Sequence, residues 1–170
     1  TEKQGRSGPL MFAEWRHVIE QEGRIVLEEL QTIVYRSATL APPAPPPAVA
    51  SAANEPEITS RRRISFDAPL LFRFSAVTFN AHRIHYDWPY ATQSERYPDL
   101  VVHGPLLAIL LALEAQRALG DVRRVDFRAH LPVFAHDDVE LLGRVSGASF
   151  IASAQRSDGA TAMTMEASAE

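Results

Sequence analysis

The sequence has 170 residues, enough for one large domain or for one domain and a fragment of another. Its net charge of −4 argues against general nucleic-acid binding, and the absence of cysteine excludes disulfides, thiolate metal sites and a cysteine nucleophile. The longest apolar run, residues 106–113, is far shorter than the ~20 residues that span a bilayer. We therefore expect no nucleic-acid partner, no membrane span and a cytoplasmic location.

Two apolar stretches, 10–20 and 24–36, open the chain around the turn-like segment 21–23. Their β-branched and aromatic residues predict a β-hairpin, and apolar residues at both parities predict that both faces are partly covered. An isolated hairpin is marginal in water, so we expect residues 1–36 to pack against something else.

A proline-rich run follows the predicted hairpin, at residues 41–47. Proline fixes φ and lacks an N–H donor, so neither a helix nor a sheet can continue through it. We expect residues 37–60 to form a semi-rigid spacer, with a ligand for a proline-binding domain as the alternative.

One helix dominates the expected domain over residues 61–170. Pro105 suits its first turn and Gly120 suits its end. Its first two turns are apolar on every side, which predicts burial on every side. Three polar residues mark the end that we expect to emerge into solvent: Glu114, Gln116 and Arg117.

Strand patterns surround this helix. A strand is expected near residues 64–67, followed by a mixed stretch over 70–98 that holds most of the His and Tyr. After the helix, we expect about four antiparallel strands, the last two joined by the turn-like segment 157–159. A sheet wrapped around one buried helix is an α+β fold of the hot-dog type, although another α+β sandwich topology stays open.

Side chains suited to proton transfer gather in one short segment. They are Asn80, His82, His85 and Asp87. If this segment is helical or turn-like, the two histidines share a face. His103 directly precedes Gly104 at the start of the predicted helix, where unpaired N–H groups would stabilise a carbonyl oxygen that gains negative charge. Neutral histidine is a good general base near pH 7, so these residues predict chemistry next to a carbonyl.

The segment 79–87, with Tyr90-Ala91 and residues 101–106, resembles the MaoC-like hot-dog hydratases and dehydratases. It is most similar to the subgroup that includes mesaconyl-CoA, 3-methylfumaryl-CoA and itaconyl-CoA hydratases and the fungal mitochondrial 3-hydroxyacyl-thioester dehydratases. The resemblance covers residues 61–170 and extends to 5–36, which is similar to the closing strands of a first hot dog. It implies that the hairpin is the remnant of that first hot dog, most of which is absent from this chain.

The resemblance implies an enoyl-CoA hydratase or 3-hydroxyacyl-CoA dehydratase with a coenzyme A thioester as substrate and no cofactor or metal. A branched or dicarboxylic C4–C5 acyl group is expected, while longer acyl chains and carrier-protein thioesters stay open. The family's catalytic histidine matches His85, and its oxyanion donor matches the Gly104 N–H. Asn80 stands where the broad family has an aspartate; it cannot ionise, but it can orient a water. We also expect His103, His82 and Asp87 around the substrate. The alternatives are that His82 holds the loop, that Asp87 caps a helix or pairs with an arginine, and that His103 is structural.

Three alternatives stay open. One is a metal site built from His82, His85, Asp87 and His103. The second is a hot-dog thioesterase, and the third is a non-catalytic subunit of a double-hot-dog hydratase. We expect a homodimer or a partner hot-dog chain. His130 and His136 are expected at the surface.

Overall fold

The computed structural model describes residues 2–5, 8–36 and 57–169. The chain divides into two compact units, Thr1–Pro43 and Ala44–Glu170, which are described separately. Most of the expected spacer over residues 37–60 lies outside the described residues.

Unit 1 is a three-stranded antiparallel sheet in the order β1-β2-β3. Its strands are β1 (Glu2–Gly5), β2 (Gly8–Gln21) and β3 (Arg24–Arg36). Between β2 and β3 the chain turns through Glu22 and Gly23, whose φ angles of 52° and 74° are the positive values that a tight two-residue hairpin turn requires. The predicted hairpin is confirmed, and β1 is a strand that the sequence analysis did not predict.

The apolar side chains of the hairpin are exposed on both faces of unit 1, and the expectation that they pack against something else stays a prediction. Ten of them are exposed: Met11, Trp15, Val18, Ile19, Ile25, Val26, Leu27, Leu30, Val34 and Tyr35. A three-stranded ribbon has no second layer to cover either face. Periodicity shows which residues are apolar but not whether another layer covers them.

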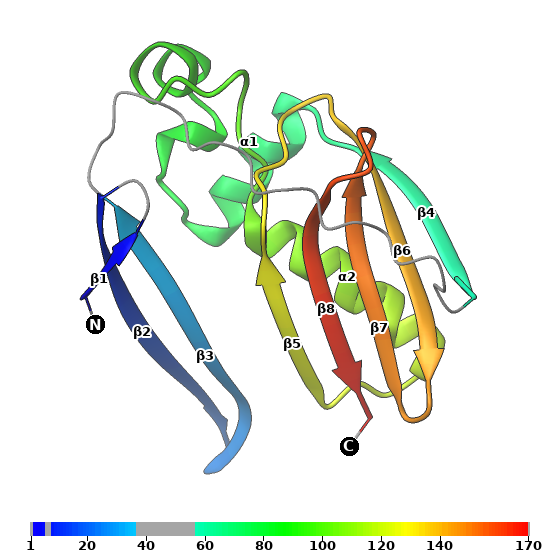
Figure 1. The fold of residues 1–170 in the computed structure, drawn as a ribbon. Coiled ribbons are helices and arrows are strands. Elements are labelled where there is room, and N and C mark those ends of the chain that lie inside the picture. The colour runs from blue at the N-terminus through cyan, green and yellow to red at the C-terminus, as the bar shows by residue number, and fades with distance from the viewer. Residues whose placement is uncertain (1, 6–7, 37–56, 170) are drawn as a thin grey trace. The chain divides into compact units, whose positions relative to one another are not determined.

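Unit 2 is a five-stranded antiparallel sheet with helices (Figure 1). The sheet order is β4-β6-β7-β8-β5. Its elements, in chain order, are β4 (Ser60–Ser65), α1 (Ala68–Thr78), the short turns η1 (Arg83–His85) and η2 (Tyr90–Ser94), α2 (Gly104–Leu119), β5 (Arg124–Ala129), β6 (Asp138–Ser146), β7 (Ser149–Arg156) and β8 (Thr161–Ser168).

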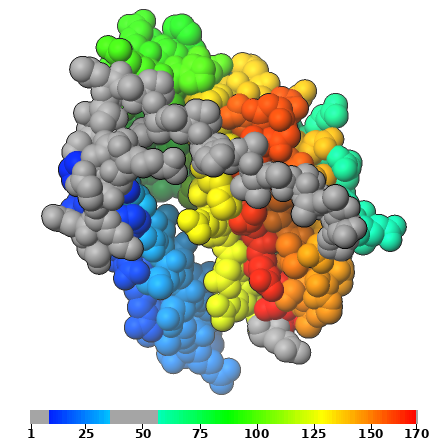
Figure 2. All heavy atoms as spheres, viewed as in Figure 1, coloured from blue at the N-terminus to red at the C-terminus, as the bar shows by residue number. Residues whose placement is uncertain are grey.

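The sheet curves around α2, which lies against its inner face (Figure 1). Leu111 and Ala115 of α2 are buried, as are Phe150 of β7 and Met163 of β8. On the outer face, β5, β8 and β7 run side by side as yellow, red and orange columns (Figure 2). A sheet wrapped around one central helix is the hot-dog layout, so the predicted fold is confirmed.

Helix α2 corrects two expectations. Ile109 and Leu113 are 48% and 40% exposed, so one side of this apolar helix is not buried. Glu114, expected in solvent, is only 8% exposed. Its carboxylate accepts a hydrogen bond from Arg62 Nη1 at 3.1 Å and also pairs with Arg117. Two guanidinium groups compensate the charge, which makes burial of the carboxylate tolerable.

Helix α1 occupies part of the stretch that the sequence analysis left as mixed. Asp67 caps it by accepting a hydrogen bond from the Leu70 N–H at 2.9 Å, and a proline lies in its first turn. The helix ends at Phe79, which has a left-handed φ of 53°. The strand expected near residues 64–67 lies instead at Ser60–Ser65, because the chain leaves the sheet at Phe66 to enter α1.

Strand β5 forms one edge of the sheet. Its Val125 and Phe127 alternate with polar residues as expected, yet all six residues of β5 are exposed. No strand pairs with the outer edge of β5 within unit 2. Across the described ranges, no helix combines the length and apolarity needed to cross a membrane.

Candidate active site

Asn80 sets the course of the loop that follows α1. Its backbone N–H donates to the Ser75 carbonyl at 2.9 Å, and its side-chain oxygen accepts the His82 N–H at 3.0 Å. The second bond is an Asx turn, a local closure that asparagine favours. The turn η1 follows and directs Ile84 and His85 into the unit. The carbonyl end of Asn80 thus shapes the loop, and its amide NH2 is the end that can donate to a water.

His85 is held in one tautomer. Its Nδ1 lies 2.7 Å from the Val101 carbonyl oxygen, which can only accept a hydrogen bond, so Nδ1 carries the proton. The lone pair of the neutral ring is therefore on Nε2. Burial lowers the pKa of His85; the bond to Val101 partly opposes this, and the charge of His82 lowers the pKa further. His85 is a neutral base at physiological pH.

His82 lies on the solvent side of His85. The two rings meet edge to face, with centroids 5.6 Å apart and an interplanar angle of 84°. The expected contact between them therefore exists. However, His82 is exposed and His85 is 7% exposed, so only one of them is inside the unit.

His103 lies directly beneath His85. It is the N-cap residue of α2 and is fully buried. Its ring stacks on that of His85 with centroids 3.7 Å apart and an interplanar angle of 19°. Burial, and secondarily the charge of His85, lower the pKa of His103 to about 4. Its ring is therefore neutral at physiological pH.

Gly104 supplies a free backbone donor next to these rings. It begins α2, the following Pro105 has no N–H, and the Leu106 N–H already bonds to the His103 carbonyl at 3.1 Å. In the described part of the chain, the Gly104 N–H has no acceptor. A Cβ placed on Gly104 would meet nothing within 4 Å, so the space beside it is open. The positive end of the α2 dipole adds to the attraction for a developing oxyanion.

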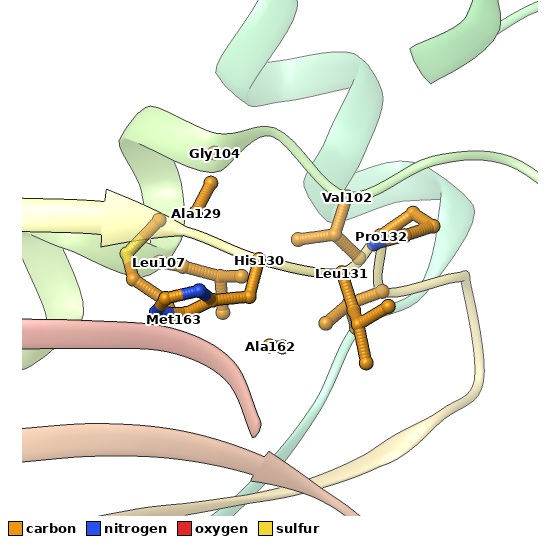
Figure 3. Close-up of a pocket in the computed structure, with 10 residues that line it drawn as sticks. Val102, Gly104, Leu107, Ala129, His130, Leu131, Pro132, Ala162 and Met163 are labelled. Atoms are coloured by element: carbon orange, nitrogen blue, oxygen red, sulfur yellow. The ribbon is translucent and has the colours of Figure 1, made fainter. Parts of the chain in front are cut away.

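A cavity of about 260 Å³ borders Gly104 (Figure 3). Its lining is mostly apolar: Val102, Leu107, Ala129, Leu131, Pro132, Val133, Ala162 and Met163. His130 is the ionisable side chain in this lining. Its Nε2 lies 2.9 Å from Thr164 Oγ1, and burial, with the charge of Arg128, lowers its pKa.

The carboxylate of Asp87 forms hydrogen bonds with groups of its own loop. Its Oδ2 accepts hydrogen bonds from Arg83 Nε and Nη2 at 2.9 and 2.7 Å, and its Oδ1 accepts the Tyr90 N–H at 3.1 Å. These contacts, the Arg83 side chain first, lower the pKa of Asp87. Arg83 also lies 4.2 Å above the Tyr90 ring. Asp87 therefore braces the loop and starts the next turn.

The described residues do not form the ligand set that the alternative of a metal site requires. Within the described ranges, no three or more His, Cys, Asp or Glu side chains are placed to hold a metal ion. The Asp87 carboxylate is paired with Arg83, and Nδ1 of His85 faces a carbonyl oxygen.

Comparisons with known proteins bear on this geometry. A family model described as hydroxyacyl-thioester dehydratase type 2 matches residues 1–135. The chain belongs to this family. Mesaconyl-C(4)-CoA hydratase of Chloroflexus aurantiacus is 46% identical over 165 residues, which cover 96% of this chain and 58% of that protein. The mitochondrial hydroxyacyl-thioester dehydratase type 2 of Schizosaccharomyces pombe is 30% identical over 132 residues, covering 74% of this chain and 42% of that protein.

This member of the dehydratase type 2 family thus spans about half the length of the curated relatives it matches. Among solved structures, HtdX of Mycobacterium tuberculosis matches with a TM-score of 0.74 at 17% identity, over 100% of this chain and 66% of that one. At that identity the likeness shows the fold alone. The family resemblance seen in the sequence is confirmed.

The fold of this family member brings His82, His85, His103 and Gly104 to one place, the start of α2. Sequence reasoning missed Ser75, whose Oγ lies 2.8 Å from Nε2 of His103. A polar residue on the buried side of α1 was the available signal, but α1 itself was not predicted. His130 and His136 are exposed as expected, although His130 also lines the cavity. The catalytic and binding roles of all these residues stay predictions.

Proposed function

We propose that the chain adds water across, or removes water to form, the C2=C3 bond of an acyl thioester. The observation that carries this proposal is the fixed tautomer of His85, whose basic Nε2 belongs to a ring stacked on His103, the residue directly before the free Gly104 N–H. A proton acceptor and an oxyanion donor are the two groups that this chemistry needs.

In the hydration direction, the thioester carbonyl accepts a hydrogen bond from the Gly104 N–H. His85 Nε2 takes a proton from a water that the Asn80 amide holds, and the hydroxide forms a bond to C3. The C2=C3 electron pair moves toward the carbonyl, giving an enolate at the helix start. The proton on His85 is then delivered to C2, which restores the neutral imidazole. Dehydration follows the same steps in reverse.

Asn80 supports this scheme as a water-orienting residue. Its side-chain oxygen is occupied by the His82 N–H, so the NH2 group is available to donate to a water oxygen. Such a donor holds the water but cannot take its proton, which leaves His85 as the base.

The cavity beside Gly104, whose lining does not include His85 or Asn80, supports the substrate class. Its lining is mostly apolar and adjoins the oxyanion donor, which suits an acyl group next to a thioester carbonyl. An acyl-CoA is proposed as the substrate, with no resident cofactor. The name of the Chloroflexus relative supports mesaconyl, a branched C5 dicarboxylic acyl group joined to coenzyme A through C4, as the first one to test.

A second hot-dog chain is the proposed partner, either another copy of this chain or a separate subunit. Val125 and Phe127 on the free edge of β5, with Ile109 and Leu113 on α2, leave apolar surface open in unit 2. Apolar surface of this kind marks protein interfaces. We also propose that the protein is cytoplasmic. Light scattering on the purified chain should give twice the monomer mass or, with a subunit, a mixed complex.

A substrate panel tests the proposed activity. Mesaconyl-CoA, crotonyl-CoA and a long-chain 2-enoyl-CoA are offered while the absorbance of the enoyl thioester is followed. We expect loss of that absorbance with no free thiol. Release of free coenzyme A would instead assign a thioesterase, and no change with any substrate would favour a non-catalytic subunit.

A further inference from the structure

Ser75 is a polar side chain at a core position. It and Leu71 are the two residues of α1 that are buried. The Ser75 hydroxyl lies 2.8 Å from Nε2 of His103, within hydrogen-bond distance. Burying a serine hydroxyl costs free energy unless it forms a hydrogen bond. The contact with His103 therefore explains why serine is tolerated at this buried position.

His103 is held from three sides. Ser75 fixes one ring nitrogen, Phe74 packs edge-on with centroids 4.8 Å apart, and His85 stacks on the ring face at 3.7 Å. Its ring plane is therefore tied to α1 through Ser75 and to the active-site loop through His85.

A histidine at this place carries a cost. Within the described residues, Nδ1 of His103 is buried and has no hydrogen-bond partner. A buried polar atom without a partner is destabilising, and a phenylalanine ring would avoid that penalty. The imidazole must therefore provide something other than packing, and its bond to Ser75 is what phenylalanine could not make.

We propose that Ser75 and His103 are positioning residues for His85: the serine fixes the His103 ring, and the His103 face fixes the plane in which His85 presents Nε2. This inference rests on the proposed function, since it concerns the base of that reaction. Val101 holds one edge of the His85 ring through Nδ1, but a single hydrogen bond leaves the ring free to tilt. The stacked face removes that freedom.

The charges around His85 fit this role. Its ionisable neighbours in the described chain are His82 at its edge and His103 at its face. The groups of α1 that contact His103 in turn, Phe74 and Ser75, do not titrate. Because the pKa of His103 is about 4, its ring stays neutral when His85 becomes an imidazolium. A neutral aromatic face tolerates that cation, whereas a charged one would repel it.

Two substitutions at His103 separate the ring from the hydrogen bond. His103→Phe keeps an aromatic face but loses the bond to Ser75, whereas His103→Gln can still reach Ser75 but has no ring. Ring-nitrogen NMR of the full chain reads the His85 tautomer directly and needs no activity. We expect one Nδ1–H tautomer in the wild type and in His103→Phe. In His103→Gln we expect a mixture of tautomers, with the pKa of His85 moved up toward 6.5 as water enters.

The second measurement is the kcat and KM of each variant with crotonyl-CoA. Small displacements of a catalytic group can cost about 100-fold in rate, so we expect His103→Gln to lower kcat by about 10- to 100-fold with KM within about threefold. His103→Phe keeps the stacked face but loses the bond to Ser75, so its kcat should fall several-fold, as in Ser75→Ala, and less than in His103→Gln. Ser75→Ala should lower kcat several-fold in the wild type and should have no further effect in His103→Phe, because the hydroxyl acts through the histidine.

His136→Asn is the matched control. His136 is exposed at a φ of 65°, a conformation that asparagine tolerates, so tautomer, melting temperature and kcat should not change. The proposal is overturned if His103→Gln retains a single His85 tautomer. It is also overturned if His103→Phe loses the tautomer as fully as His103→Gln does. If no enoyl-CoA is hydrated at all, the proposed function fails, and the NMR result still decides the positioning role.

Discussion

At the scale of the residue, the orientation and tautomer of a side chain matter as much as its identity. The sequence shows that His85 and Gly104 are present, and its motif places them in a known family pattern. It does not show that a backbone carbonyl, Val101, selects the tautomer of His85, because that contact joins residues 16 positions apart through the fold. Nor does it show Ser75, whose role depends on a helix with no clear apolar period.

The pH dependence follows from the His85 tautomer. Hydration needs the neutral ring, so kcat/KM should be constant above the pKa of His85 and should fall about tenfold per pH unit below it. Burial lowers that pKa from 6.5, which puts the loss of rate on the acid side of pH 6.5. A rate profile from pH 4.5 to 8 checks this. An acid limb centred above pH 7 would contradict the assignment of the base.

Gly104→Ala tests the oxyanion position. The added methyl meets no protein atom within 4 Å, and alanine is the better helix former, so the free energy of unfolding should stay equal or rise by up to about 1 kcal/mol. The methyl would, however, enter the space that the acyl thioester is proposed to occupy. We expect kcat/KM to fall at least about tenfold. Unchanged kcat/KM would remove Gly104 from the site.

At the scale of the element, the sequence predicted the helix and strands that are strongly apolar and missed the helix that is not. Helix α2 was predicted because a continuous apolar run lies between Pro105 and Gly120, and the strands after it because their apolar residues alternate with polar ones. Helix α1 was missed because it buries only Leu71 and Ser75. Its start was nevertheless marked by Asp67 followed by Pro69, a cap and a first-turn proline.

Asp67→Ala should weaken α1. The carboxylate accepts the Leu70 N–H, and loss of an N-cap costs about 1 kcal/mol of unfolding free energy. Urea unfolding measures the change. Asp67→Asn keeps a capping oxygen and should retain most of the stability; equal loss in both variants would show that the cap is not the cause.

The ring of Phe150 in β7 lies over Gly143 of β6 and leaves no room for a side chain there. A Cβ there would lie 2.1 Å from Cζ of Phe150, whose ring is fully buried. Gly143→Ala should therefore cost about 1–3 kcal/mol through overpacking, measured by urea unfolding. The double variant Gly143→Ala with Phe150→Leu should recover part of that loss, and a more than additive loss would contradict this packing.

At the scale of the whole molecule, the open surfaces are the feature that the sequence could not predict. Periodicity identifies apolar faces but not what covers them. The hairpin, expected to pack against something else, is exposed in unit 1, and one side of α2, expected to be buried, is open. The chain spans 58% and 42% of two curated relatives, which is consistent with a fold whose apolar surface extends beyond one hot dog. The proposed second hot-dog chain would cover such surface.

The most direct test of the central claim is enoyl-thioester absorbance during reaction with crotonyl-CoA or mesaconyl-CoA, for the wild type and for His85→Ala. We expect that the wild type removes the absorbance and that His85→Ala, while still folded, does so at least about 100-fold more slowly. Hydration by His85→Ala at the wild-type rate would contradict the account.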